Sequence, residues 1–419
     1  MLPLHFDDKA ALLVVALLLV LGPWLVWRLP AVRRVAPLAV VQIVAGVLLG
    51  PSALGRFWPE GQAALFRPGV LGALGGLSTM GVSLYVFCTG MHLDGATLRE
   101  GARRLGGAAV GSMALPLLLG LGAGYAIAAF WPETMGARAD KAAFATAVAI
   151  CVAVTALPVL AAILKEMGLI ATRLGQTALA LAALNDAALW LAIALLLALA
   201  AGSGGASLAV AGLSLAWVLL VAFLARPLLR RAAARPRAEG TRLVAALSTA
   251  FAAAATAEMI GLGLIIGAFA AGVVMPPAWR ATLLERLEPL TAAALLPFFF
   301  VVTGLRATIL PDSAAFLGML AIVTAATVAG KVAGTALPAR LAGEGWPSAL
   351  ALGALMQTKG LMEVVVLTVL LDAGLIGPGI FSAMVAMAIL CTLATAPLAR
   401  LALSRQGGRA MPAEPRPAG

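Results

Sequence analysis

The residues best placed to do chemistry are a few polar side chains inside long apolar runs. Asn185 and Asp186 lie within residues 174–200, which are otherwise almost wholly apolar or small. A carboxylate at the centre of a membrane helix costs roughly 2.5–3.5 kcal/mol on insertion scales. A structural carboxylate that hydrogen-bonds a neighbouring helix is the alternative. We favour a functional role, because other polar residues occur at matching places in the chain.

Three further charges lie inside apolar runs: Lys331, Lys359 and Glu363. Buried charges need partners. Lys331 is the only charge in its run, so a pair with Asp186 is the simplest neutralisation. Lys359 and Glu363 are four residues apart and can pair on one helix face. We interpret that pair as structural, with Glu363 as an auxiliary residue at most.

A buried carboxylate near an ammonium group suggests competition between two small cations. Burial disfavours the charged carboxylate and a nearby ammonium favours it. Asp186 can therefore hold either a proton or a monovalent metal cation, and a single such group predicts one proton per cation. Asn185 cannot ionise but can orient the site. The three cysteines lie in separate apolar runs and predict neither a disulfide framework nor a metal site; no cofactor is expected.

The composition predicts an all-α polytopic membrane protein. Of 419 residues, 62% are hydrophobic and 11% are charged, whereas soluble domains carry about 25% charged residues. The net charge of +11 does not indicate nucleic-acid binding, because the basic residues lie in short loops between apolar runs. That distribution is the topology signal of a protein whose partner is the lipid bilayer.

About thirteen apolar runs are long enough to span a bilayer. They are residues 10–28, 35–50, 70–90, 104–130, 143–164, 172–200, 206–224, 243–258, 260–274, 289–306, 313–338, 347–372 and 375–400. With this count, 21 of the 29 Lys and Arg residues fall on one side. The positive-inside rule then places the C-terminus in the cytoplasm and the N-terminus outside the cell inner (plasma) membrane. Residues 404–419 are predicted to be a disordered cytoplasmic tail.

The two halves of the chain resemble each other. Ala45-Gly46-Val47 ends the second span and Ala271-Gly272-Val273 ends the ninth, while Thr89-Gly90 ends the third and Thr303-Gly304 ends the tenth. The matching spans are seven apart, and an odd offset reverses their direction through the membrane. Inverted-topology repeats of this kind are typical of secondary transporters.

The same repeat pairs the fifth span with the twelfth, and both carry a helix-breaking stretch at mid-depth. These stretches are Thr155-Ala156-Leu157-Pro158 and Gln357-Thr358-Lys359-Gly360. Pro158 removes a helix hydrogen bond. Two broken helices in corresponding places predict a crossing at the midplane, with a binding site beside it.

Several stretches together resemble the monovalent cation:proton antiporter-2 family, and most closely its cation/H⁺ exchanger branch. They are VAGVLLGPSALG (44–55), VTALPVLAAILKEMGLI (154–170), LNDAALW (184–190), IIGAFAAGVVMP (265–276), LPFFFVVTGLR (296–306), GKVAGT (330–335) and TKGLMEVVVL (358–367). The sequence departs from the family pattern at Gln42, His92, Gly263 and Gln357.

The resemblance implies an elevator-type antiporter that exchanges Na⁺ or K⁺ for H⁺. It implies a transmembrane domain over residues 1–403, with a core bundle at about 104–200 and 313–400 and a dimerisation bundle at about 10–90 and 243–306. It places the cation or proton at Asp186, beside Asn185 and Thr155, and makes Lys331 the functional basic residue. A homodimer is expected. No regulatory nucleotide domain is evident in the sequence, so nucleotide control is not expected.

Two other classes of function stay open. A sodium-coupled symporter of a small organic solute could use a related inverted-repeat fold, although few polar residues are available to line its larger cavity. An intramembrane enzyme is the less favoured alternative. The sequence has no HExxH zinc motif, no aspartate-rich diphosphate motif and no Gly-Xaa-Ser-Xaa-Gly elbow.

Overall fold

The computed structural model describes residues 8–404 apart from 34–35, 93–94, 171, 201–215, 218–219, 222–224, 234–237, 261–263 and 310–312. Every named element in these residues is helical. The first half contains α1 (Asp8–Trp27), α2 (Pro30–Arg33), α3 (Leu38–Leu49), α4 (Leu54–Phe57), α5 (Pro59–Leu65), α6 (Pro68–His92), α7 (Gly95–Phe130), the 3₁₀ turn η1 (Pro132–Thr134), α8 (Lys141–Ala153), α9 (Leu157–Glu166) and α10 (Arg173–Ala200). The second contains α12 (Arg226–Ala233), α13 (Glu239–Met259), α14 (Leu264–Val274), α15 (Pro277–Leu290), the π-turn η3 (Thr291–Leu295), α16 (Leu296–Arg306), α17 (Ala314–Leu341), α18 (Trp346–Met356), α19 (Leu361–Asp372) and α20 (Pro378–Ser404).

The helices have the length and apolarity of membrane spans. Within the described residues, seven helical segments could cross a bilayer: Asp8–Trp27, Leu38–Phe57, Pro68–His92, Gly106–Phe130, Pro277–Arg306, Ala314–Leu341 and Pro378–Ser404. Shorter apolar helices at α8, α14 and α18 accompany them. The all-α polytopic fold is therefore confirmed. The count of thirteen stays a prediction, because most of residues 206–224 lie outside the described part of the chain, as do residues 405–419 of the predicted tail.

The tenth span differs from its prediction. The sequence places it at residues 289–306, whereas the structure begins the helical segment at Pro277 with α15. Charged residues in α15 interrupt the apolar run, so hydropathy alone does not extend the span. The helix forms because Trp279, Leu283 and Leu287, spaced four residues apart, are all buried.

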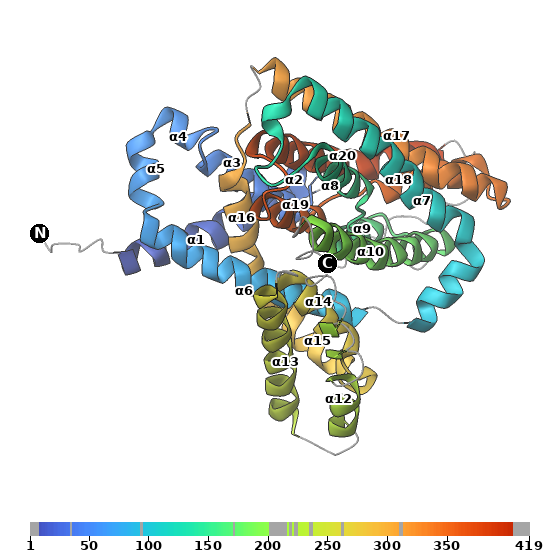
Figure 1. Ribbon diagram of the computed structural model, residues 1–419, viewed down its shortest axis with the longest axis horizontal. Coiled ribbons are helices and arrows are strands. Elements are labelled where there is room, and N and C mark those ends of the chain that lie inside the picture. Colours follow the sequence, from blue (N-terminus) through green and yellow to red (C-terminus); the bar gives the residue numbers. More distant parts are fainter. Residues whose placement is uncertain are drawn as a thin grey trace, which may run out of the picture.

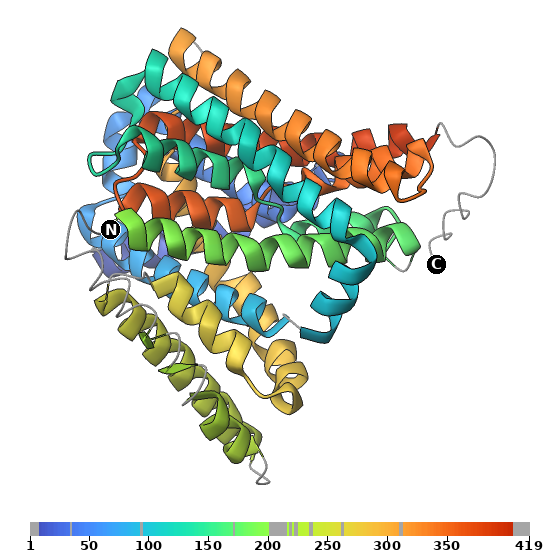
Figure 2. The same cartoon turned by 45° about the vertical axis from the view of Figure 1, so that its right-hand side comes forward.

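The helices pack in two groups, visible in Figures 1 and 2. One group surrounds the two interrupted helices α8–α9 and α18–α19 and includes α7, α10, α17 and α20. The long helices α7 and α17 run side by side along its flank (Figure 2). The other group contains α1, α3, α6 and α13–α16. We call them the core group and the scaffold group.

Glycines at matching places in the two halves make reciprocal contacts. A Cβ at Gly46 would lie 2.9 Å from the Cα of Gly304, and a Cβ at Gly90 would lie 3.0 Å from the Cα of Gly272. The sequence repeat matches Gly46 with Gly272 and Gly90 with Gly304. The Gly46–Gly304 contact therefore corresponds, through the repeat, to the Gly272–Gly90 contact. These crossings, α3 on α16 and α6 on α14, let backbones approach as small residues do in membrane helix pairs.

Candidate functional site

Both predicted helix breaks are present, and they cross. α8 ends at Ala153 and α9 begins at Leu157, while α18 ends at Met356 and α19 begins at Leu361. The backbone N–H of Ala156 donates to the carbonyl of Thr358 (2.9 Å). Pro158 lies in the first turn of α9, where a missing N–H removes no intrahelical bond. Thr155, Ala156, Leu157 and Pro158 thus meet Gln357, Thr358, Lys359 and Gly360 at one crossing.

Gly360 makes the second break possible. Its φ of 151° is a conformation that residues with a Cβ rarely adopt. A Cβ there would also lie 2.7 Å from Cγ2 of Val159. The glycine therefore allows α19 to start at close quarters with α9.

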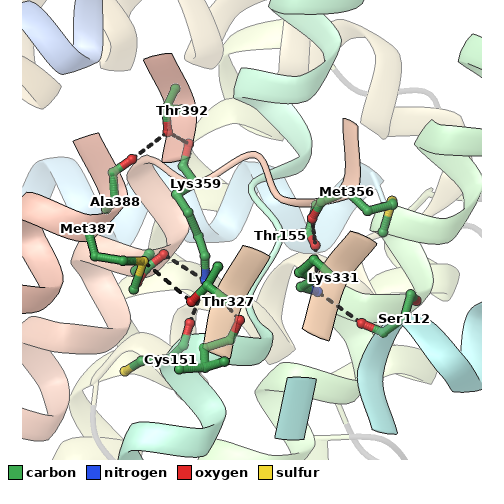
Figure 3. Close-up of polar contacts among 12 residues, drawn as sticks. Ser112, Cys151, Thr155, Thr327, Lys331, Met356, Lys359, Met387, Ala388 and Thr392 are labelled. Carbon is green, nitrogen blue, oxygen red and sulfur yellow. Dashed lines mark hydrogen bonds and ion pairs between the residues drawn. The ribbon is translucent and has the colours of Figure 1, made fainter. Parts of the chain in front are cut away.

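Lys359 is fully buried at the crossing, and its ammonium group has three acceptors (Figure 3). The Nζ atom lies 2.6 Å from the carbonyl oxygen of Cys151, 3.1 Å from that of Val152 and 3.0 Å from Oε2 of Glu363. The two carbonyls belong to the last turn of α8, the negative end of that half-helix. An ammonium group has three N–H donors, so this lysine is saturated. The ion pair with Glu363 that the four-residue spacing predicts is present.

Lys331, on α17, is linked to the end of α18 through the hydroxyl of Thr155 (Figure 3). Its Nζ donates to the hydroxyl of Thr155 (2.8 Å) and to the carbonyl of Ser112 (3.1 Å). The Thr155 hydroxyl in turn donates to the carbonyl of Met356 at the end of α18 (2.8 Å). These bonds occupy two of the three donors of Lys331. The third has no protein acceptor among the described residues.

Asn185 and Asp186 lie on α10, each 2% exposed. The hydroxyl of Ser112 donates to Oδ1 of Asn185 (3.1 Å). Oδ1 of Asp186 and Nδ2 of Asn185 are buried with no hydrogen-bond partner among the described residues. The predicted ion pair between Asp186 and Lys331 is absent from this conformation and stays a prediction for another state.

Gln357 adds a further open acceptor at the crossing. It is fully buried, and neither its amide oxygen nor its amide nitrogen has a partner among the described residues. Buried polar atoms are normally satisfied, and exceptions often indicate a missing water or ion. The crossing therefore combines an unsatisfied carboxylate oxygen, an unsatisfied amide and a lysine with a free donor.

A cavity of about 490 Å³ lies between the two groups of helices. The scaffold group lines it with residues of α6, α13, α14 and α16, and the core group with residues of α10 and α19. Ile193 and Leu197 line it from α10, and Ile193 is seven residues, or about two turns, from Asp186. The cavity therefore leads along the α10 face on which Asp186 lies.

Sequence reasoning missed three residues that belong to this region. Ser112 bonds both Lys331 and Asn185, Thr392 of α20 donates to the carbonyl of Lys359 (2.8 Å), and Tyr85 of α6 has a buried hydroxyl without a partner. No signal in the sequence marks Ser112, because its role depends on a close contact between two helices that only the fold creates. Gly111, its neighbour, packs directly on the backbone of Gly334.

Comparison with known proteins agrees with this geometry. The family described as "Sodium/hydrogen exchanger, transmembrane" matches residues 15–401. "Cation/H(+) antiporter 17" of Arabidopsis thaliana is 33% identical over 94% of this chain and 48% of its own length. "Na(+)/H(+) antiporter NhaS4" of Synechocystis is 29% identical over 94% of this chain and 97% of its own length. The sodium proton antiporter MjNhaP1 from Methanocaldococcus jannaschii shares the fold, with a TM-score of 0.62 at 14% identity, over 96% of this chain and 100% of that one.

An all-helical membrane fold in which two interrupted helices cross beside a buried carboxylate is an arrangement typical of secondary transporters. The chain belongs to the sodium/hydrogen exchanger transmembrane family. That family consists of multi-pass membrane transporters, not enzymes. The chain spans about half the length of the first curated relatives it matches.

Proposed function

We propose that the chain is a secondary active antiporter that exchanges a monovalent cation, Na⁺ or K⁺, for H⁺. Asp186 binds either the cation or the proton, and Asn185 and Thr155 complete the site. Lys331 is the charge partner. Its free N–H donor pairs with Asp186 when the site holds neither cation nor proton, and the pair separates when either of them binds. The names of the similar antiporters support this reading.

One observation carries the proposal: Asp186 is buried among the helices, on a helix that contacts both α9 and α18 of the crossing, and one of its carboxylate oxygens has no hydrogen-bond partner among the described residues. Oε1 of Glu363 also has no hydrogen-bond partner among the described residues, but Glu363 has Lys359 as its counter-charge, whereas no described residue forms an ion pair with Asp186, and a buried charge needs a partner. An unsatisfied oxygen is instead available to a proton or to a small cation, and the two compete because each neutralises the same charge.

The transport cycle that fits this arrangement is an elevator in which the core group moves against the scaffold group. The cavity lies between the groups, so relative movement would close it and open another on the opposite side. Its charged lining residues Arg138, Glu258, Arg306 and Asp372 all belong to loops or span ends that the charge distribution places outside. We infer that this conformation is open to the outside, with the C-terminus in the cytoplasm.

The scaffold group is also the proposed homodimer surface, and the plasma membrane is the proposed location. Both rest on the family resemblance. Crosslinking of single cysteines introduced along α1 in native membranes tests the dimer. If α1 carries the interface, one face of the helix should crosslink and the opposite face should not.

The decisive test is the variant Asp186→Asn in reconstituted vesicles. Cation-dependent proton flux should fall to background with both Na⁺ and K⁺, while the protein stays folded; loss of a desolvated charge can even raise thermal stability. Glu60→Gln, which removes an exposed carboxylate, is the matched control and should transport normally. Flux through Asp186→Asn at near wild-type rate would overturn the assignment.

The same vesicles separate the remaining functions. A solute symporter would carry Na⁺ together with an organic solute and would not exchange it for protons. An enzyme would show neither flux. Comparing Na⁺ with K⁺ fixes the selectivity of the antiporter, because selectivity depends on the oxygen geometry around the bound ion.

A further inference from the structure

Tyr85 is the scaffold residue that bears most directly on the candidate cation site. It lies on α6, and its ring packs against the apolar cluster that contains the crossing helices. Its hydroxyl oxygen is buried and has no hydrogen-bond partner among the described residues. A phenol has one O–H donor and an acceptor oxygen, and here both are unused.

The cavity is lined by the faces of α6 and α10 that carry Tyr85 and Asp186. On α6 the lining residues include Ser78 and Val82, and Tyr85 follows Val82 by three residues, about one turn deeper. On α10 the lining residue Ile193 follows Asp186 by seven residues, so Asp186 lies on the same helix face about two turns from it. Tyr85 and Asp186 therefore lie on the faces of α6 and α10 that line the cavity, each deeper along its helix than the lining residues.

The unsatisfied groups of Asp186 and Tyr85 could both bind the same monovalent cation. Oδ1 of Asp186 and the hydroxyl of Tyr85 have no protein partner in the described part of the chain, and neither bonds the other directly. A monovalent cation between them would take one carboxylate and one hydroxyl oxygen, ligands that hard cations prefer. With the site empty, a water molecule could accept from the phenol and donate to the carboxylate.

We propose that Tyr85 is a cation-binding residue supplied by the scaffold group: its hydroxyl oxygen coordinates the monovalent cation that reaches Asp186 through the cavity. This proposal deepens the proposed antiport function and rests on it. The other ligands come from the core group, so only Tyr85 ties cation affinity to the position of the core against the scaffold. Affinity should therefore be highest from the side to which this cavity opens.

The test removes the hydroxyl alone. Tyr85→Phe is compared with Tyr125→Phe, which alters the only other tyrosine of the chain, a half-exposed residue on α7. In vesicles the cation concentration that gives half-maximal proton flux should rise about tenfold in Tyr85→Phe, as loss of one charge-assisted contact implies. The maximal rate should stay within about twofold, and Tyr125→Phe should match the wild type. An unchanged half-maximal concentration in Tyr85→Phe would overturn the proposal.

A second readout keeps this proposal separate from antiport itself. Purified protein is heated with increasing Na⁺ or K⁺, and choline serves as the control. If the wild type shows no proton flux, the antiport proposal fails, while cation protection against unfolding still reports binding. Tyr85→Phe should then need about tenfold more cation for equal protection. Equal protection of the variant and the wild type, or protection of neither, overturns the role of Tyr85.

A spectroscopic measurement covers a Tyr85→Phe variant that does not fold. In the Tyr125→Phe protein, Tyr85 is the only tyrosine. Its ultraviolet resonance Raman bands, which respond to hydrogen bonding of the phenol, should change with saturating Na⁺ or K⁺ and not with choline. If the Raman bands of Tyr85 stay unchanged while the cation still protects the protein against thermal unfolding, the cation binds away from Tyr85.

Discussion

The Nζ atom of Lys359 lies 3.0 Å from Oε2 of Glu363, one helical turn further along the chain, and both side chains are fully buried. The other two donors of Lys359 bind carbonyls at the end of α8. The ammonium group of Lys359 is therefore closed to further acceptors, although Oε1 of Glu363 has no hydrogen-bond partner among the described residues, whereas Lys331 keeps one donor free. The two buried lysines therefore differ: Lys359 binds the end of α8 at the crossing, and we propose that Lys331 serves the cation site.

The first prediction concerns the contribution of the buried Lys359–Glu363 pair to the stability of the fold. Glu363→Gln should lower the free energy of unfolding by about 3–5 kcal/mol, because it leaves the buried ammonium without its counter-charge. Lys359→Met should do the same. The double variant should lose less than the sum of the two, because no single buried charge remains. Thermal unfolding in detergent measures all three, and additive losses would show that the residues do not act as a pair.

The second prediction tests the glycine crossings. Gly90→Ala should destabilise the protein by about 1–3 kcal/mol, because its Cβ would lie 2.3 Å from the carbonyl oxygen of Phe269 on α14. Gly72→Ala on the same helix is the matched control, since a Cβ there meets nothing within 4 Å. The control should be neutral or slightly stabilising. Equal unfolding temperatures for the two variants would contradict the α6–α14 packing.

The third prediction concerns the pH response set by Lys331. Lys331→Gln removes the ammonium that favours the ionised form of Asp186, so the carboxylate should keep its proton to higher pH. The pH profile of cation-driven proton flux should move to higher pH, and stability should fall, because the Thr155 and Ser112 contacts change. Lys141→Gln, an exposed lysine at the start of α8, should leave the profile in place. An unshifted profile for Lys331→Gln, or a shift to lower pH, would exclude this role.

Features carried by local chemistry were accessible from the sequence. Pro158 favours the first turn of a new helix and Gly360 adopts a backbone conformation that interrupts one, so both breaks were predictable. The spacing of Lys359 and Glu363 likewise predicts their pair. Contacts between distant helices were not accessible. Nothing in the sequence around Ser112 says that α7 brings it to both Lys331 and Asn185. Tyr85 was not predicted as a site residue, because its relation to Asp186 arises only when the two groups of helices meet.

The final prediction concerns the contact between the two groups at the cavity. Arg306, at the end of the scaffold helix α16, lies 3.0 Å from Asp372, at the end of the core helix α19, and both side chains are about half exposed. Such a pair contributes at most about 1 kcal/mol, so Asp372→Asn should barely change the unfolding temperature. If the core moves against the scaffold, however, the pair must break. If the step that breaks this pair limits turnover, Asp372→Asn should raise the maximal exchange rate by up to about fivefold.

Salt supplies an internal control, because it screens exposed ion pairs. The maximal rate of the wild type should rise with ionic strength, whereas that of Asp372→Asn should not. The charge-exchanged variant Arg306→Asp with Asp372→Arg should recover both the slower rate and its salt dependence. If the wild-type rate does not change with ionic strength and the Asp372→Asn rate equals it, the ends of α16 and α19 do not separate in the rate-limiting step.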